Sequence, residues 1–138
     1  MFNINITSEP LNVSGSLQWI QAPDCGAINA FIGTVRDASK GRSVSALEFE
    51  AYEKMAMSEL FKIAEEAKRK WSLNRVLIHH RIGTLLVGEI AVLILVSCPH
   101  RNESFESCSY IIDTLKQTVP IWKKEIYEDG STWIDAHP

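Results

Sequence analysis

The longest uninterrupted apolar stretch of the sequence, Ile90–Val96, is the feature that most restricts how this chain can fold. It is far shorter than the ~20 residues that a membrane-spanning helix requires, so we predict no membrane span. A short apolar run bounded by turn residues is typical of a strand that is buried on both faces. We therefore predict that Glu89–Cys98 forms a strand in the middle of a sheet.

Shorter patterns predict the remaining elements. Further strands are predicted where apolar and polar residues alternate or where glycine bounds an apolar run. These segments are 2–6, 26–36, 45–52, 75–81 and 121–127, with a short last strand through Trp133 and Ile134. The strands at 75–81 and 89–98 are expected to form a long hairpin through Gly83 and Gly88, and 37–43 is expected to be a loop.

Helical spacing of apolar residues predicts a short helix over 14–21 and two longer ones. The first long helix, Glu53–Trp71, should bury one stripe: Ala56, Leu60, Ile63, Ala64, Ala67 and Trp71. The second should begin after Asn102 as its N-cap, end at Pro120, and bury Phe105, Cys108, Ile112, Leu115 and Val119. Helices that interrupt antiparallel strand pairs indicate an α+β fold rather than a doubly wound sheet.

Composition narrows the class of protein further. The net charge of -3 argues against nucleic acid or an anionic membrane as a partner, because both require a sustained basic surface. Three cysteines and no apolar leader indicate a reduced, cytoplasmic protein without a disulfide framework. No linker-like stretch and no internal repeat interrupts the sequence, so we expect residues 1–138 to form a single domain.

Several common catalytic signatures are missing from the sequence. Gly26 and Gly33 are too far apart for a dinucleotide-binding turn, and there is neither a phosphate-binding loop nor a Gly-x-Ser-x-Gly elbow. A metal site is a weak alternative: its candidate ligands would be His79, His80, Cys98 and His100. Their spacing fits no standard zinc pattern, and buried cysteines with hydrogen-bonded histidines explain these residues more simply.

Positively charged residues gather at the ends of the expected elements, where a scaffold can hold them around a pocket: Arg36, His100, Arg101, Lys116, Lys123 and Lys124. The His100-Arg101 pair leads into a helix N-terminus, which favours an anion, and Arg36 and Arg101 could together hold a phosphate. Simpler roles also exist. Lys116 can offset a helix dipole, and Lys123 can form a surface ion pair with Glu125.

In these same segments the sequence resembles the catalytic subunits of molybdopterin synthase, the MoaE family. The matching blocks, in the family's order, are Gly26–Arg36, Leu47–Ala56, His80–Gly83 with Gly88–Glu89, His100–Arg101, Asp113–Lys116, Pro120–Glu125, and Gly130 with Trp133. Any one block alone is weak. The ordered set, which extends from Gly26 nearly to the end of the chain, is specific.

The resemblance implies an α/β-hammerhead fold, with a largely antiparallel sheet on which helices pack, and a homodimer. Each subunit is expected to bind one small, ubiquitin-like sulfur carrier of the MoaD type, which gives a 2+2 heterotetramer. The thiocarboxylate at the carrier's C-terminal Gly-Gly would supply sulfur to cyclic pyranopterin monophosphate and so form the dithiolene of molybdopterin. This is a sulfurtransferase reaction of molybdenum cofactor biosynthesis, and the resemblance implies neither a metal nor a cofactor.

The matching motifs also imply roles for individual residues. Lys116 is expected to be the principal catalytic residue, with Lys123 beside it, as a general base or as a contact for the incoming acyl carbon. The expected substrate-binding residues are Thr34, Val35, Arg36, His100, Arg101, Lys116, Lys123, Lys124 and Glu125, with Lys124 and Glu125 on one wall and the dimer partner completing the phosphate site. A scaffold that keeps only the fold and the docking surface is the alternative, and the two lysines favour the enzyme.

Overall fold

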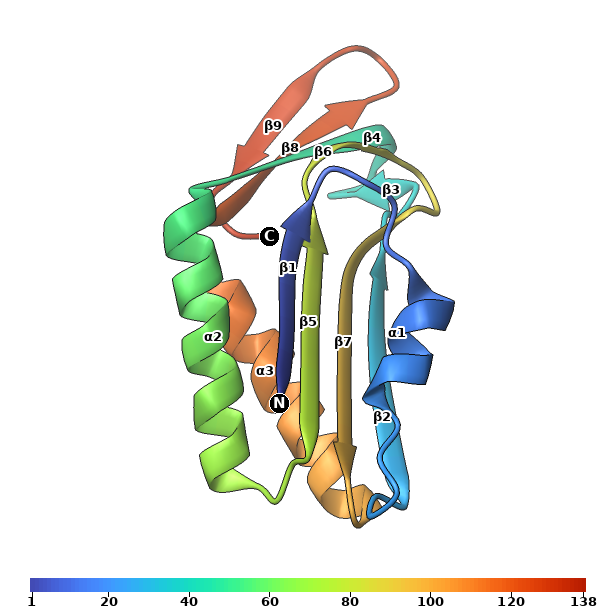
Figure 1. Ribbon diagram of the computed structural model, residues 1–138. Helices are drawn as coiled ribbons and strands as arrows, with labels where there is room; N and C mark the ends of the chain where they lie inside the picture. The colour runs from blue at the N-terminus through green and yellow to red at the C-terminus, as the bar shows by residue number, and fades with distance from the viewer.

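A computed structural model describes residues 1–138 and contains two sheets and three helices (Figure 1). The first sheet has the order β1-β5-β7-β2, formed by β1 (Phe2–Thr7), β5 (Arg75–Arg81), β7 (Ile90–Cys98) and β2 (Ala27–Thr34). In the second sheet β4 (Arg42–Ala51) pairs with β3 (Ala38–Ser39), β6 (Gly83–Leu86) and β8 (Ile121–Tyr127), and β8 pairs with β9 (Thr132–Asp135). Only β1 and β5 pair in parallel. The predicted α+β class with largely antiparallel sheets is confirmed.

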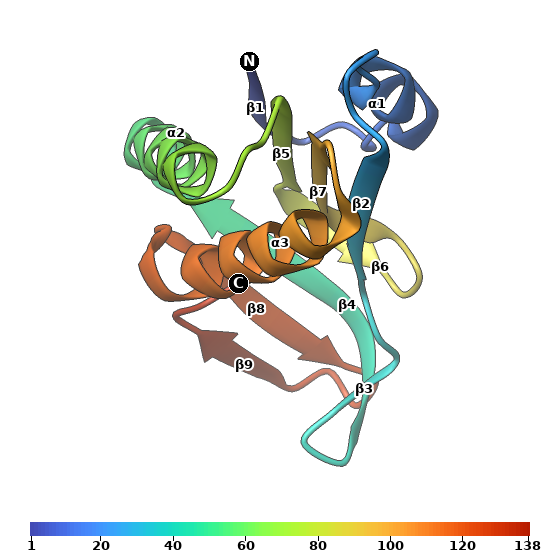
Figure 2. The ribbon, with the colours of Figure 1, turned by 90° about the horizontal axis from the view of Figure 1, so that it is seen from below.

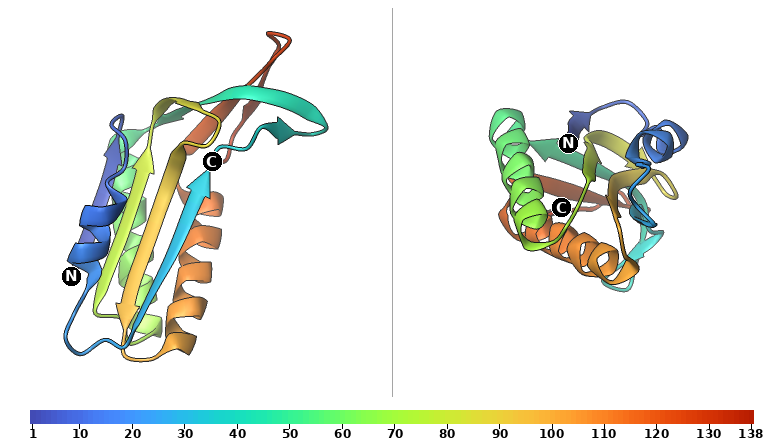
Figure 3. Two further views of the ribbon diagram at one scale, coloured as in Figure 1. Left: turned by 90° about the vertical axis from the view of Figure 1, so that its right-hand side faces the viewer. Right: turned by 60° about the horizontal axis from the view of Figure 1, so that its bottom comes forward.

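Helices cover both faces of the first sheet. The short helix α1 (Val13–Ile20) packs on β5 and β7 from one side. The longer helices α2 (Glu53–Lys70) and α3 (Arg101–Thr118) pack from the other side, α2 on β1 and β5 and α3 on β2 and β7 (Figure 2, Figure 3). Strand β4 runs across the end of this sheet, which is the hammerhead arrangement (Figure 1).

Strand β7 lies between β5 and β2, as the apolar run predicts. Its alternate residues enter two different clusters. Val92, Ile94 and Val96 join the main core beneath α2 and α3, whereas Leu93 and Leu95 pack with Ile20 of α1. Burial on both faces therefore explains why this strand has no polar alternation.

The stripe of α2 is also confirmed. Ala56, Leu60, Ile63, Ala64 and Ala67 are buried, and Trp71, the residue that caps the helix, is half-buried against the core. Small alanines alternate with larger residues along this stripe, so the helix can approach the sheet closely. No helix of the structure is both long and apolar enough to cross a membrane.

Two connections differ from the prediction. Strands β5 and β7 pair as expected, but the segment between them is not a simple turn, because Gly83–Leu86 forms β6 and pairs with β4 in the other sheet. The expected loop at 37–43 contains β3, which pairs with β4 around Lys40 and Gly41. Both turn residues have positive φ, 53° and 74°, as a tight two-residue hairpin requires.

The start of α3 also differs. His100, not Asn102, is the N-cap residue, and no side chain caps the helix. Phe105 is 59% exposed rather than buried. The buried face begins instead with Ser104 and Ser107, whose hydroxyl groups donate to carbonyl oxygens one turn earlier. Because serine is a polar residue, the spacing of apolar residues does not reveal this buried face of the helix.

Candidate active site

A pocket lies where the two sheets and the end of α3 meet. Half of its eighteen lining residues are hydrophobic, including Phe31, Phe49 and Leu115. The polar lining residues are Thr34, Arg36, Ser39, His80, Lys116, Lys123 and Glu125. A pocket of this composition suits a ligand with both an apolar ring and an anionic group.

Local structure explains how three positive charges reach this pocket. Arg36 follows β2 just beyond a register shift at Gly33 and Thr34, and Lys116 lies in the last turn of α3. Lys123 and Glu125 lie two residues apart on β8, so both side chains point to the same face. Arg36, Lys116 and Lys123, which the sequence predicted as part of one site, are brought together.

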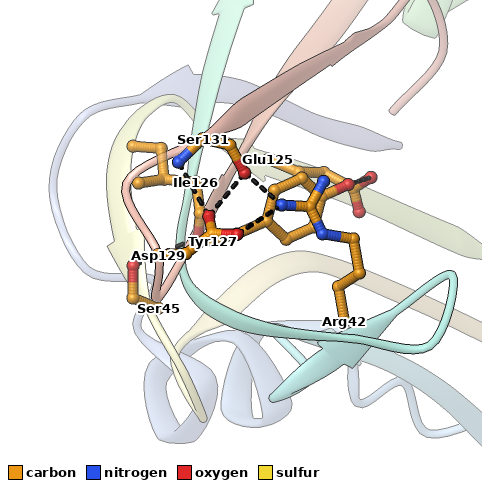
Figure 4. A network of polar contacts seen from close by, with 7 residues as sticks. All are labelled: Arg42, Ser45, Glu125, Ile126, Tyr127, Asp129 and Ser131. Carbon is orange, nitrogen blue, oxygen red and sulfur yellow. Dashed lines mark hydrogen bonds and ion pairs between the residues drawn. The ribbon is translucent and has the colours of Figure 1, made fainter.

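Glu125 is the only acidic side chain that lines the pocket, and it is 3% exposed. Its Oε1 accepts a hydrogen bond from the Tyr127 hydroxyl at 3.2 Å and lies 3.5 Å from Nζ of Lys40. Figure 4 shows that Tyr127 is itself held by Arg42, whose guanidinium lies 4.0 Å over the ring and 2.8 Å from Asp129. The carboxylate is therefore held by Tyr127 at the end of β8 and by Lys40 in the β3–β4 turn, and Arg42 of β4 holds Tyr127 in turn.

Burial alone would raise the pKa of the Glu125 carboxyl group. Hydrogen bonds from Ser39 and Tyr127 and the charges of Lys123 and Lys40 outweigh this effect, so the pKa lies below its ordinary value. The ionised carboxylate is therefore the form that the folded protein favours.

We expect Glu125→Gln to lower the free energy of unfolding at neutral pH by about 1 kcal/mol and to flatten its dependence on acid. A lowered folded-state pKa stabilises the protein above the ordinary carboxyl pKa, and this contribution is lost as the pH falls through the folded-state value. Urea unfolding of both proteins from about pH 7 to about pH 3 measures the difference. Parallel curves would show that the Glu125 charge does not stabilise the fold.

The other predicted pair, His100 and Arg101, lies at the opposite end of the first sheet. They surround a separate depression with Gly26, where Ala27 pairs with Cys98. The eight-residue strand β2 separates this depression from the pocket at Thr34, a length of about 25 Å. Within one protomer, Arg36 and Arg101 therefore cannot hold the same phosphate.

Two further predicted residues do not line the pocket. Lys124 lies on the outer face of β8 with Glu48, Glu50 and Trp122, because successive strand residues point to opposite faces. The expectation that Lys124 and Glu125 share one wall is wrong. Val35 is 3% exposed in the main core, and its N–H and carbonyl already pair with Glu89 and Gly88.

The residues of the metal alternative are dispersed. The Cys98 thiol donates to the carbonyl of His100, and His79 donates through Nε2 to Oδ1 of Asn3. The structure brings together no three His, Cys, Asp or Glu side chains that could hold a metal ion. His80 instead lines the main pocket. The sequence could have predicted this position, since His80 lies on the same face of β5 as the core residues Val76 and Ile78.

Fold and pocket together define a small α+β protein that presents positively charged side chains to a partly apolar, anionic ligand. Comparison with known proteins identifies the family. A family model for MoaE protein matches residues 6–118. The molybdopterin synthase catalytic subunit of Homo sapiens is 48% identical over 94% of this chain and 69% of its own length. The chain belongs to the MoaE family of molybdopterin synthase catalytic subunits, which are sulfurtransferases of molybdenum cofactor biosynthesis.

Solved structures agree with this assignment. The crystal structure of molybdopterin synthase from Staphylococcus aureus is 40% identical, covers 96% of both chains and has a TM-score of 0.90. A complex of subunits 1 and 2 of the molybdopterin-converting factor from Helicobacter pylori is 23% identical over 99% of this chain and 93% of its own, with a TM-score of 0.76. At that identity it supports the fold alone.

Proposed function

We propose that the pocket transfers sulfur from the C-terminal thiocarboxylate of a small carrier protein to cyclic pyranopterin monophosphate. The observation that carries this proposal is the convergence of Arg36, Lys116 and Lys123 on one partly apolar pocket. The apolar wall suits the flat pterin ring, and the positive charges suit its phosphate and the incoming thiocarboxylate. Thr34 and Glu125, which the resemblance also implied, line the same pocket.

Lys116 and Lys123 have complementary roles in this proposal. Lys116 approaches from the end of α3 and acts either as a general base that takes a proton from the attacking group or as a contact for the acyl carbon. Lys123 approaches from β8, where Glu125 fixes the neighbouring wall, and its positive charge stabilises the oxyanion that develops on that carbonyl. The two groups come from different elements, so they can face the reacting atoms from two sides.

We propose that the working unit is a homodimer in which the partner supplies His100 and Arg101 to the phosphate site. Two observations support it. Each protomer leaves these residues about 25 Å from its own Arg36. Ile28 and Ile32 on the edge strand β2 remain 44% and 43% exposed, an apolar edge that a second copy can cover.

The carrier in this proposal is a small MoaD-like protein with a C-terminal Gly-Gly, bound once per protomer to give a 2+2 heterotetramer. The Helicobacter pylori structure, which has the same fold, is itself a complex of two different subunits, the kind of pairing proposed here. We also propose a cytoplasmic location, supported by three cysteines that are all free thiols.

Reconstitution tests the reaction directly. The purified protein, mixed with thiocarboxylated carrier and cyclic pyranopterin monophosphate, is expected to form the dithiolene product and to consume two thiocarboxylates per product. A control with carrier that ends in an ordinary carboxylate should give no product. If the protein binds the thiocarboxylated carrier but forms no product, it is a scaffold and the enzyme proposal fails.

A further inference from the structure

His80 lines the proposed pocket, yet the lysine chemistry leaves it without a role. It is 2% exposed and belongs to β5, where it pairs with Val92 of β7. Val92 in turn pairs with Gly33 of β2, so the three residues form one row across the sheet. Because His80 alternates with the core residues Val76 and Ile78, it faces the side that α2 and α3 cover.

The side chains of Val92 and Phe31 fill the space that a side chain at Gly33 would need. A Cβ atom at Gly33 would lie 2.5 Å from Cγ1 of Val92, closer than two carbons can approach. The row therefore ends in bare backbone, and both Gly33 and His80 line the pocket. The imidazole ring is held from the side by Phe49, with ring centroids 5.1 Å apart in an edge-to-face contact.

Hydrogen bonding fixes which nitrogen of His80 carries the proton. Nδ1 lies 2.8 Å from the carbonyl oxygen of Arg81, and a carbonyl can only accept, so Nδ1 is the donor. Nε2 has no partner within the protein, whereas every fully enclosed side-chain nitrogen and oxygen has one. Nε2 therefore retains access to open space, and the open space that His80 borders is the pocket.

The ring is neutral at physiological pH. Burial lowers the pKa of His80 to about 4, and the nearby charge of Lys116 acts in the same direction, against the hydrogen bond to the Arg81 carbonyl. A neutral ring with a protonated Nδ1 presents a lone pair at Nε2. His80 thus offers the pocket an acceptor and no positive charge.

Few side chains of the pocket can accept a hydrogen bond. Arg36 and the charged forms of Lys116 and Lys123 only donate, and Oε1 of Glu125 is already engaged by Tyr127 and Lys40. The hydroxyl groups of Thr34 and Ser39 are the other side-chain acceptors. A pterin carries ring N–H and amino groups that lose hydrogen bonds to water on entering an apolar pocket, and each unpaired donor weakens binding.

We infer that Nε2 of His80 accepts a hydrogen bond from an N–H group of the bound pterin and so helps the pocket to select a pterin ring. This inference rests on the function proposed above. It divides recognition between two regions of the site: the cations hold the phosphate, and His80 holds the heterocycle.

Two substitutions at one position isolate this hydrogen bond. His80→Phe keeps the ring and its contact with Phe49 but removes the acceptor, whereas His80→Gln can place its amide oxygen close to the position of Nε2. Both variants lose the Nδ1 hydrogen bond to Arg81, so the difference between them reports the acceptor. His79→Phe, on the opposite face of β5, is the control for removing a neighbouring histidine.

Calorimetric titration with cyclic pyranopterin monophosphate is the measurement. We expect His80→Phe to weaken binding about tenfold, and His80→Gln and His79→Phe to remain within about threefold of the original protein. Equal affinity of His80→Phe and the original protein would overturn the inference, as would unchanged affinity with slower turnover. If the original protein itself binds no pterin, the proposed function fails as well, whereas equal binding by the original protein and His80→Phe overturns only this inference.

Discussion

Lys116→Ala is expected to slow dithiolene formation by a hundredfold or more, on the order of the loss of a base or nucleophile, while the protein stays folded. Lys116 is exposed at the end of α3, and the core residues Leu115 and Val119 on either side of it are unchanged by the substitution. Single-turnover consumption of the carrier thiocarboxylate measures the rate, and thermal unfolding checks the fold.

Lys70→Ala is the matched control for this experiment. Lys70 lies in the last turn of α2, as Lys116 lies in the last turn of α3, so each offsets a helix dipole in the same way. Lys70 does not line the pocket. Lys70→Ala also removes a cation-π contact with the Tyr110 ring, whose centroid lies 4.2 Å from Nζ, so it should lose slightly more stability. Only Lys116→Ala should lose activity. Similar activities of the two variants would show that Lys116 only offsets the helix dipole and is not catalytic.

The positions of Lys116, Lys123 and Glu125 show how much of such a site a sequence can predict. Residues two apart on a strand share a face, and a lysine four residues before a helix-ending proline lies in the last turn of that helix. These short-range rules correctly bring Lys116 and Lys123 to one end of the fold. The same rule of alternation excludes Lys124 from that face, although its sequence neighbours suggest otherwise.

Contacts between segments far apart in the sequence were harder to predict. The burial of β7 on both faces could be predicted because it depends on the composition of one segment. The pairing of β6 with β4 could not be predicted, since it joins residues 34 to 40 positions apart and β6 itself is only four residues long. The same limit applies to His100 and Arg101 in the site. Their residue types indicate anion binding, but their distance from Arg36 depends on the direction in which β2 and β7 run.

The shared phosphate site makes a prediction about mixtures of inactive variants. Arg36→Ala and Arg101→Ala should each weaken substrate binding by at least about tenfold, since each removes hydrogen bonds to a charged group. In a mixed dimer of the two, one site lacks both arginines and the other retains both. Random exchange of protomers should therefore restore about a quarter of all sites.

The control for the mixture follows from the same geometry. Arg36 and Lys116 line one pocket of one protomer, so a mixed dimer of Arg36→Ala and Lys116→Ala contains one defect in each site and no intact site. Recovery of activity in the Arg36/Arg101 mixture without recovery in the Arg36/Lys116 mixture requires that Arg101 acts across the dimer. Absence of recovery in both mixtures would confine phosphate binding to one protomer, where Arg101 is too far from Arg36 to contribute.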